Sequence, residues 1–184
     1  DLPSISGDFV IGKTLTANRG RWNRNGNSIF GYEWLRGSTV VGTSSTYRLT
    51  ADDAGQRIAL RVTNTNFDRD KRQSVSATTP STVAKYAAKV TGKATKVKKG
   101  KKAGATKVTI RVKAAGQAAA KITGKVNVAQ GKKKVAKAKV KKGKATFLLK
   151  PKFAKPGKRA FTVKYSGNAT TLAVQGKVKV KIKK

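Results

Sequence analysis

The sequence predicts an all-β protein made of β-sandwiches, and three observations support that prediction. Apolar and polar residues alternate along short runs, as they do in strands that bury one face. Turn residues such as Gly37 and Gly55 separate these runs, and glycine adopts the positive φ angles of tight turns without steric cost. The runs follow one another at intervals of about 8–12 residues, which is typical of sandwich strands.

In the first half of the chain, four runs are expected to form strands. They cover residues 32–36, 39–41, 46–49 and 57–62. The last run is the clearest, because Ile58, Leu60 and Val62 share one face and its two arginines lie on the other. We therefore expect these three apolar side chains in the core.

The second half repeats the alternation, with lysine at most of the polar positions. Val108, Ile110 and Val112 alternate with polar neighbours. Further runs of this kind cover residues 121–128, 161–165 and 177–183. A disordered basic tail is the alternative, since Lys, Ala and Gly are abundant here. Such a tail has no reason to place an apolar residue at every second position, so we expect folded strands.

Charge is distributed very unequally between the two halves. Residues 85–184 hold 30 Lys, 2 Arg and no acid, a formal charge of +32. Residues 1–84 hold 2 Lys, 9 Arg and all seven acids, a formal +4 of the total +36. The composition changes near residues 81–85, so we predict two domains, 1–84 and 85–184.

The composition argues against an enzyme. There is no Cys for a disulfide or thiolate metal site, and no His to serve as general base or metal ligand. Without His, the Ser and Thr hydroxyls lack their usual activating base, and the few carboxylates show no sign of a facing pair. We expect no catalytic residue, no cofactor and no metal site.

The chain starts at Asp1 and contains no Met, so we expect a processed product or a C-terminal fragment of a longer protein. No apolar run approaches the roughly 20 residues that cross a membrane, so no transmembrane segment is predicted.

The first half resembles an immunoglobulin-like repeat of secreted and surface proteins of actinobacteria. The resemblance covers about residues 3–83. The matching segments are 12–17, 20–22, 32–36, 46–50 and 53–58. The second half looks like a bacterial immunoglobulin-like domain, through residues 142–146, 156–168 and 178–182. The resemblance implies two tandem immunoglobulin-like β-sandwiches that act as extracellular spacers, stalks or adhesive appendages.

Some residues of the first half are open to a functional or a structural interpretation. Trp34 is expected in the core, and Trp22 is expected to pack, although an exposed Trp22 could stack on a sugar. Asp52 and Asp53 are expected to fix a turn by accepting backbone N–H groups, because two adjacent carboxylates do not supply the six to eight oxygens that Ca²⁺ needs. Asn66, Asp68 and Asp70 have the spacing of some Ca²⁺ loops, but basic residues interleave and there is neither a Gly at the bend nor a closing Glu. A solvated hairpin loop is therefore expected there.

Two lysine clusters form the candidate anion-binding site. The denser one is expected to be a hairpin with one charged face, and it comprises Lys132, Lys133, Lys134, Lys137, Lys139, Lys141, Lys142 and Lys144. The second comprises Lys96, Lys98, Lys99, Lys101 and Lys102. Lysine on edge strands prevents aggregation, but that role explains only a handful of these residues. It does not explain the absence of every acid, since mixed charge would solubilise the domain as well.

The expected partner is an anionic polymer. Lysine lacks the planar fork by which arginine reads bases, and the aromatic residues of the second half fall mostly at core positions. Non-specific, salt-sensitive attraction to phosphate or carboxylate polymers remains. Teichoic acid, acidic glycans and anionic lipid surfaces are the expected polymers, with non-specific nucleic acid after them.

These observations predict a non-catalytic extracellular module, associated with the cell surface or cell wall, that combines a spacer with electrostatic attachment. One alternative is a structural subunit of a surface filament, lattice or phage virion, which would require self-assembly. Another is the accessory C-terminal region of a secreted hydrolase.

Overall fold

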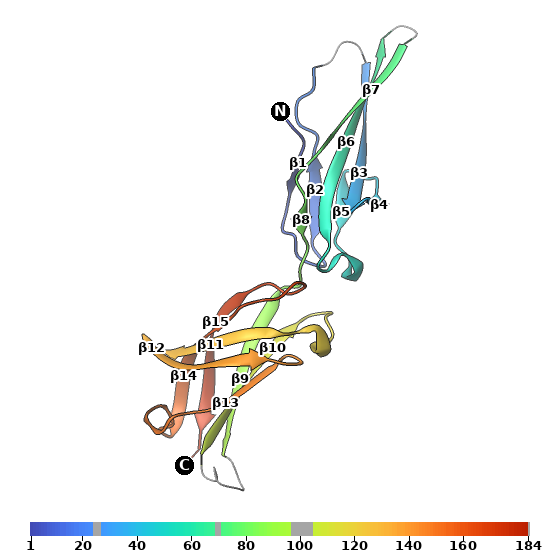
Figure 1. Cartoon of the computed structure of the whole chain (residues 1–184). Coiled ribbons are helices and arrows are strands. Elements are labelled where there is room, and N and C mark those ends of the chain that lie inside the picture. The colour runs from blue at the N-terminus through green and yellow to red at the C-terminus, as the bar shows by residue number, and fades with distance from the viewer. Residues whose placement is uncertain (24–26, 69–70, 97–104, 184) are drawn as a thin grey trace. The chain divides into compact units, whose positions relative to one another are not determined.

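The protein is all-β, as predicted, and the chain folds as two compact units, Asp1–Lys85 and Tyr86–Lys184 (Figure 1). This computed structural model describes residues 1–23, 27–68, 71–96 and 105–183. No α-helix occurs among the described residues, and none of their short helical turns has the length and apolar character needed to cross a membrane.

Unit 1 consists of two antiparallel sheets. The smaller sheet has the order β1-β2-β5 and comprises β1 (Ser4–Ser6), β2 (Thr14–Asn18) and β5 (Thr46–Arg48). The larger sheet has the order β4-β3-β6-β7, with β8 also beside β6, and comprises β3 (Asn27–Arg36), β4 (Thr39–Gly42), β6 (Arg57–Asp68), β7 (Lys71–Thr78) and β8 (Thr82–Val83). A 3-10 helix, η1 (Ala51–Asp53), joins β5 to β6. Because the chain changes sheet after β2, after β4 and after β5, the two sheets are interlocked in the manner of an immunoglobulin-like sandwich.

Unit 2 repeats the same topology. Its smaller sheet has the order β13-β10-β9 and comprises β9 (Ala88–Lys96), β10 (Thr106–Ala114) and β13 (Lys144–Leu148). Its larger sheet has the order β12-β11-β14-β15 and comprises β11 (Gly124–Gln130), β12 (Lys133–Val140), β14 (Gly157–Tyr165) and β15 (Val174–Ile182). The 3-10 helices η2 (Ala119–Lys121) and η3 (Pro151–Phe153) lie in its connections. In both units the first, second and fifth strands form one sheet, so both are immunoglobulin-like sandwiches.

The core of unit 1 is organised around Trp34, whose side chain is fully buried. Its ring stacks on that of Tyr47 with the centroids 5.7 Å apart, and its indole N–H donates a 2.9 Å hydrogen bond to the carbonyl of Ser44. Ile58, Leu60 and Val62 are also fully buried, as their alternation predicts. The core position predicted for Trp34 is therefore confirmed.

The core of unit 2 is built from alternate residues of β10, β14 and β15. Its large apolar side chains buried from these strands are Val108, Ile110, Val112, Phe161, Val163, Tyr165, Val178, Val180 and Ile182. The residues between them are mostly exposed. Folded strands, and not a disordered tail, thus account for the alternation in this half.

The two sheets of unit 2 approach each other closely where β9 meets β15. A Cβ atom on Gly92 would lie 2.6 Å from Cγ1 of Val178, and one on Gly176 would lie 3.0 Å from Cγ2 of Val90. Both distances are shorter than ordinary carbon–carbon contacts. The absence of a side chain at Gly92 and Gly176 therefore permits the sandwich to close along this edge.

Candidate anion-binding surface

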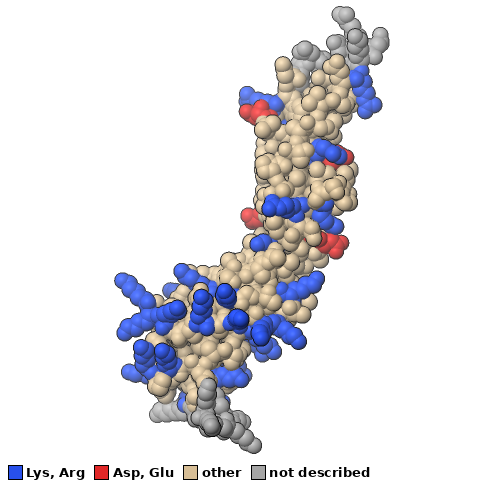
Figure 2. Space-filling model, viewed as in Figure 1, with Lys and Arg blue, Asp and Glu red and all other residues tan. Residues whose placement is uncertain are grey.

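All acidic side chains of the chain lie in unit 1, and unit 2 contains no Asp or Glu. Among the described residues, three ion pairs form in unit 1: Arg21 with Asp1, Arg36 with Asp53, and Arg61 with Glu33. In unit 2 every described lysine from Lys89 to Lys183 is exposed. Figure 2 shows the result, with acidic side chains on unit 1 only and basic side chains projecting over unit 2. The positive charge of unit 2 has no internal counter-charge.

The outer surface of the larger sheet of unit 2 carries the densest array of these lysines, and we call it the lysine face. Its members alternate with buried residues such as Val126, Phe161 and Val178, so they point away from the core. They come from all four strands. The members are Lys125, Lys134, Lys137, Lys139, Lys158, Lys164, Lys177, Lys179 and Lys181.

Strand register places lysines of this face directly opposite one another. Lys125 pairs with Lys139 across β11 and β12, and Lys158 pairs with Lys181 across β14 and β15. Asn127 lies between Lys137 on one side and Lys164 on the other. Like charges in directly opposite positions are destabilising. A bound polyanion would relieve this repulsion.

The predicted clusters map only in part onto the lysine face. Of the denser cluster, Lys134, Lys137 and Lys139 lie on this face. Lys132 lies in the turn before β12, and Lys133 is the first residue of β12. The remaining three, Lys141, Lys142 and Lys144, lie where the chain crosses to the smaller sheet.

The predicted hairpin is present, because β12 pairs with β11, but the prediction that all eight lysines share one charged face is wrong. β12 and β13 belong to different sheets and are joined only by an isolated bridge between Lys141 and Lys144 among the described residues. Of the second cluster, Lys96 ends β9 in the smaller sheet. Lys98, Lys99, Lys101 and Lys102 lie outside the described residues.

Sequence reasoning did not assign six lysines of this face to the candidate site. They are Lys125, Lys158, Lys164, Lys177, Lys179 and Lys181. Their alternation with apolar residues placed some of them on a solvated face. They did not stand out as a cluster because they are spread over more than 50 residues of sequence, and only strand pairing brings them together.

The outer surface of the smaller sheet differs, because threonine interrupts its basic residues. The row across its three strands formed by Lys93, Thr109 and Thr146 holds a single charge. The hydroxyls of Thr109 and Thr146 lie 3.4 Å apart, within hydrogen-bonding reach. This second surface is therefore less densely charged and supplies a natural comparison for the lysine face.

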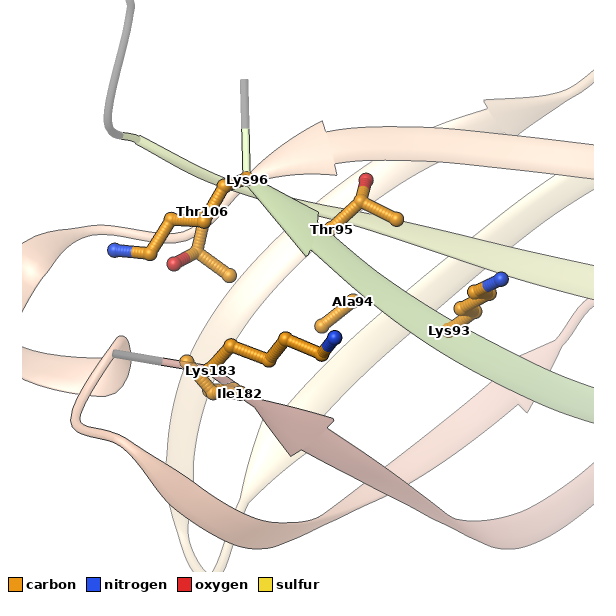
Figure 3. Close-up of a pocket in the computed structure, with 7 residues that line it drawn as sticks. All are labelled: Lys93, Ala94, Thr95, Lys96, Thr106, Ile182 and Lys183. Carbon is orange, nitrogen blue, oxygen red and sulfur yellow. The ribbon is translucent and has the colours of Figure 1, made fainter. Parts of the chain in front are cut away.

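A pocket of about 350 Å³ opens at the end of unit 2, between β9, β10 and β15 (Figure 3). Its lining residues are Lys93, Ala94, Thr95, Lys96, Thr106, Ile182 and Lys183. The hydroxyl of Thr106 is buried there and has no hydrogen-bond partner among the described residues. The described residues of the lining include no carboxylate side chain.

Unit 1 contains the Asp53 corner, and it has a structural role. The carboxylate of Asp53 is fully buried and accepts hydrogen bonds from the Thr50 amide at 2.6 Å and from Arg36 Nε at 2.8 Å. The Tyr47 hydroxyl donates to it at 2.9 Å. Backbone N–H donation to an aspartate at this turn was predicted and is confirmed for Asp53.

Two other motifs of unit 1 lie at Trp22 and at the β6–β7 hairpin. Trp22 packs edge-on against Phe30, with the ring centroids 6.1 Å apart, and its indole N–H donates to the carbonyl of Arg19 at 2.6 Å. At the end of the β6–β7 hairpin the backbone of Asp68 pairs with that of Lys71, and Asp70 lies outside the described residues. No group of three or more acidic side chains that could hold a metal occurs among the described residues.

These features define a class of protein: a pair of immunoglobulin-like β-sandwiches, the second of which has an acid-free, lysine-covered surface. No protein-family model matches the chain, and no curated protein matches it. Among solved structures, the chain is similar to one described as "Structures of Clostridium thermocellum CbhA fibronectin(III)-like modules". The sequence identity is 14%, the TM-score is 0.33, and the match covers 99% of this chain and 94% of that chain.

Proposed function

We propose that the protein is a non-catalytic extracellular module whose second unit attaches it to an anionic polymer of a cell envelope or surface. The observation that carries this proposal is the lysine face, with nine exposed ammonium groups on one sheet surface of a unit that contains no carboxylate. The resemblance to actinobacterial surface proteins suggests where this polymer is found. The surface of an actinobacterium provides teichoic acids, acidic glycans and anionic lipids.

The mechanism of attachment is the release of counterions. Each lysine that neutralises a phosphate or carboxylate of the polymer frees a condensed cation, so affinity falls steeply with salt. For about six to ten contacts, the loss between 50 and 200 mM salt is about 10³–10⁵-fold on a nucleic acid. Because ammonium groups are compact charges without directional forks, the lysine face tolerates different polymers.

Unit 1 would serve as the spacer and support of the attached unit. Three of its acidic side chains pair with arginines among the described residues, as in the 2.6 Å contact between Arg61 Nε and Glu33 Oε2. Its core is closed around Trp34 without a disulfide. A folded spacer with little net charge leaves the attachment to unit 2.

The test uses the intact chain and purified envelope polymer over a salt series. The variant K137T/K164T/K177T/K179T removes four charges from the lysine face. The matched control, K89T/K93T/K107T/K150T, removes four charges of unit 2 that lie outside the lysine face. We expect binding to disappear in 1 M salt, and the first variant to lose much more affinity than the control.

Two results would contradict the proposal. Retention that is unchanged in 1 M salt would exclude an electrostatic attachment. Equal losses for both quadruple variants would show that net charge alone matters and that the lysine face has no special role.

A structural subunit is the second candidate, because the edge of unit 1 at β7 is unprotected. Residues 73–78 of this edge strand carry no charge and no proline, and Val75 is 63% exposed. Such edges pair readily with another copy. Sizing the protein over a range of concentrations tests this role: V75K should abolish any assembly, and a monomer at all concentrations would exclude it.

A further inference from the structure

Four basic side chains of unit 2 line one small depression away from the lysine face. Arg111 and Lys113 come from β10, Lys142 from the β12–β13 turn, and Lys144 from β13. The depression has a volume of about 80 Å³, and Gly143 also lines it. Arg111 and Lys144 are directly paired across the two strands. Charge is therefore concentrated here around a defined space.

Arg111 is the first sign that this site has a specific role. Unit 2 contains 29 lysines but only two arginines, Arg111 and Arg159. Arg159 has an evident structural role, because its guanidinium donates to the carbonyls of Lys155 and Pro156, both at 3.1 Å. Arg111 is exposed and has no hydrogen-bond or ion-pair partner among the described residues. A lysine would supply the same charge, but only arginine offers a planar fork that binds two oxygens of an anion.

The backbone at Lys142 is the second sign. Its φ is 48°, and it is the one non-glycine residue with a positive φ among those the structure describes. With Gly143, at φ 69°, it forms a two-residue turn closed by hydrogen bonds between the backbones of Lys141 and Lys144. Asparagine or glycine is favoured at the position of Lys142 in such turns, and lysine is strained there. Strain of this kind is retained mainly where a side chain is needed.

The turn is also held rigidly against β10. The Gly143 amide donates to the carbonyl of Ile122 at 2.9 Å, and its carbonyl accepts from the Val112 amide at 2.8 Å. A Cβ atom on Gly143 would lie 2.8 Å from the carbonyl oxygen of Val112, so no larger residue fits. The backbone positions that carry the four cationic side chains are therefore fixed before a ligand binds. This lowers the entropy lost on binding.

We propose that this depression binds a single phosphate group, either free inorganic phosphate or one group of a phosphate-containing polymer. In liquid water each molecule takes up about 30 Å³. The depression therefore accommodates a chemical group about as large as two or three water molecules. Four cationic donors can contact three or four oxygens of a tetrahedral anion. A planar carboxylate offers only two, and unit 2 has no Asp or Glu side chain to compete.

The test is an amide NMR titration of the intact chain with inorganic phosphate, and with acetate at equal ionic strength as comparison. We expect saturable shifts first at residues 111–113 and 142–144, with phosphate binding at least tenfold tighter than acetate. A glycerol phosphate polymer that displaces inorganic phosphate from these residues would identify a polymer as the source; failure to displace it would identify the free ion.

Matched variants separate this site from general charge attraction. R111K keeps the charge but should weaken phosphate binding about tenfold, as expected for one lost charge-assisted hydrogen bond. R159K changes the other arginine and should leave the affinity unchanged. K142N should weaken binding and also raise the melting temperature, because it removes the strain from the turn. The lysine-face variant should bind phosphate at this site like the wild type, so the two proposals can fail separately.

The proposal is overturned if R111K binds phosphate like the wild type, or if phosphate shifts residues of the lysine face as strongly as residues 111–113. Either result would mean that phosphate only joins the diffuse counterion layer. A K142N variant with unchanged affinity would likewise remove Lys142 from the site.

Discussion

Arg36 donates a 2.8 Å hydrogen bond through Nε to Oδ1 of Asp53, whose side chain is completely buried. The pair joins the end of β3 to the 3-10 helix that leads into β6. Three further donors, the Thr50 amide, the Thr50 hydroxyl and the Tyr47 hydroxyl, complete the shell of the carboxylate. In a unit without disulfides, this corner links elements that belong to opposite sheets.

Replacing Asp53 should therefore destabilise unit 1 strongly. Removing one partner of a buried ion pair costs about 3–5 kcal/mol. D53N should approach this loss, because it leaves Arg36 without its counter-charge. D52N is the control, because Asp52 is exposed and forms none of these bonds. Both tryptophans lie in unit 1, so urea unfolding followed by tryptophan fluorescence measures the effect. Equal stability of D53N and D52N would contradict the prediction.

Acid should weaken unit 1 through the same carboxylate. Burial raises the pKa of Asp53, but the hydrogen bonds from Thr50, Arg36 and Tyr47 outweigh burial and hold that pKa below its ordinary value. The Arg61 hydrogen bond lowers the pKa of Glu33 in the same way. A depressed folded-state pKa stabilises the protein fully above about pH 4 and loses this contribution as the pH falls further. Urea unfolding between pH 2 and 6 should show this decline, and D53N should flatten it more than E33Q.

A methyl group at Gly92 should destabilise unit 2. The new Cβ would lie 2.6 Å from Cγ1 of Val178, and a β-branched side chain has little freedom to move aside. Overpacking of this kind costs about 1–3 kcal/mol. Hydrogen exchange of β10 and β14 measures the loss for G92A, and G92A/V178A should recover part of it. G31A is the control, since nothing lies within 4 Å of a Cβ at Gly31.

Salt should stabilise unit 2 and leave unit 1 nearly unchanged. Added ions screen the repulsion between opposed lysines such as Lys125 and Lys139, and the Debye length falls from about 30 Å at 0.01 M to about 8 Å at 0.15 M. Hydrogen exchange of the intact chain at 10 mM and 500 mM sodium chloride reports both units at once. Protection that rises equally in the two units would show that the effect is not due to the lysines.

Tyr165 should ionise later than an exposed tyrosine. Burial raises its pKa above the ordinary value of about 10, and a hydrogen bond with Thr171 offsets only part of the shift. Its hydroxyl donates a 2.6 Å hydrogen bond to the carbonyl of Thr123. A raised folded-state pKa supports the fold below about pH 10, and that support is lost as the pH rises further. Phenolate absorbance of the wild type minus that of Y165F should give a midpoint above 10; a lower midpoint would contradict the prediction.

Much of the fold could be predicted because β-strand side chains alternate with a period of two. That period alone predicted burial of Ile58, Leu60 and Val62 in one unit, and of Val178 and Val180 in the other. The aspartate turn was also predictable, because short acidic side chains cap backbone N–H groups locally. Each of these inferences depends on residues that are neighbours in sequence.

The candidate site depended on contacts that sequence does not reveal. Alternation places Lys164 on a solvated face, but only the pairing of β11 with β12 and β14 puts it beside Asn127 and close to Lys137. Lys137 and Lys144 were predicted to lie on one charged face, but the chain changes sheet between them.

The sequence by itself determined that the protein is all-β, which residues of each strand face the core, and that the second half carries its charge without a single acid. The tertiary structure alone decided which lysines share a surface and that Arg111 meets Lys142 at one depression. The physical reason is that side-chain alternation is a local property of each strand. Register and sheet membership are set by pairing between distant strands, through backbone hydrogen bonds that are the same for every residue type.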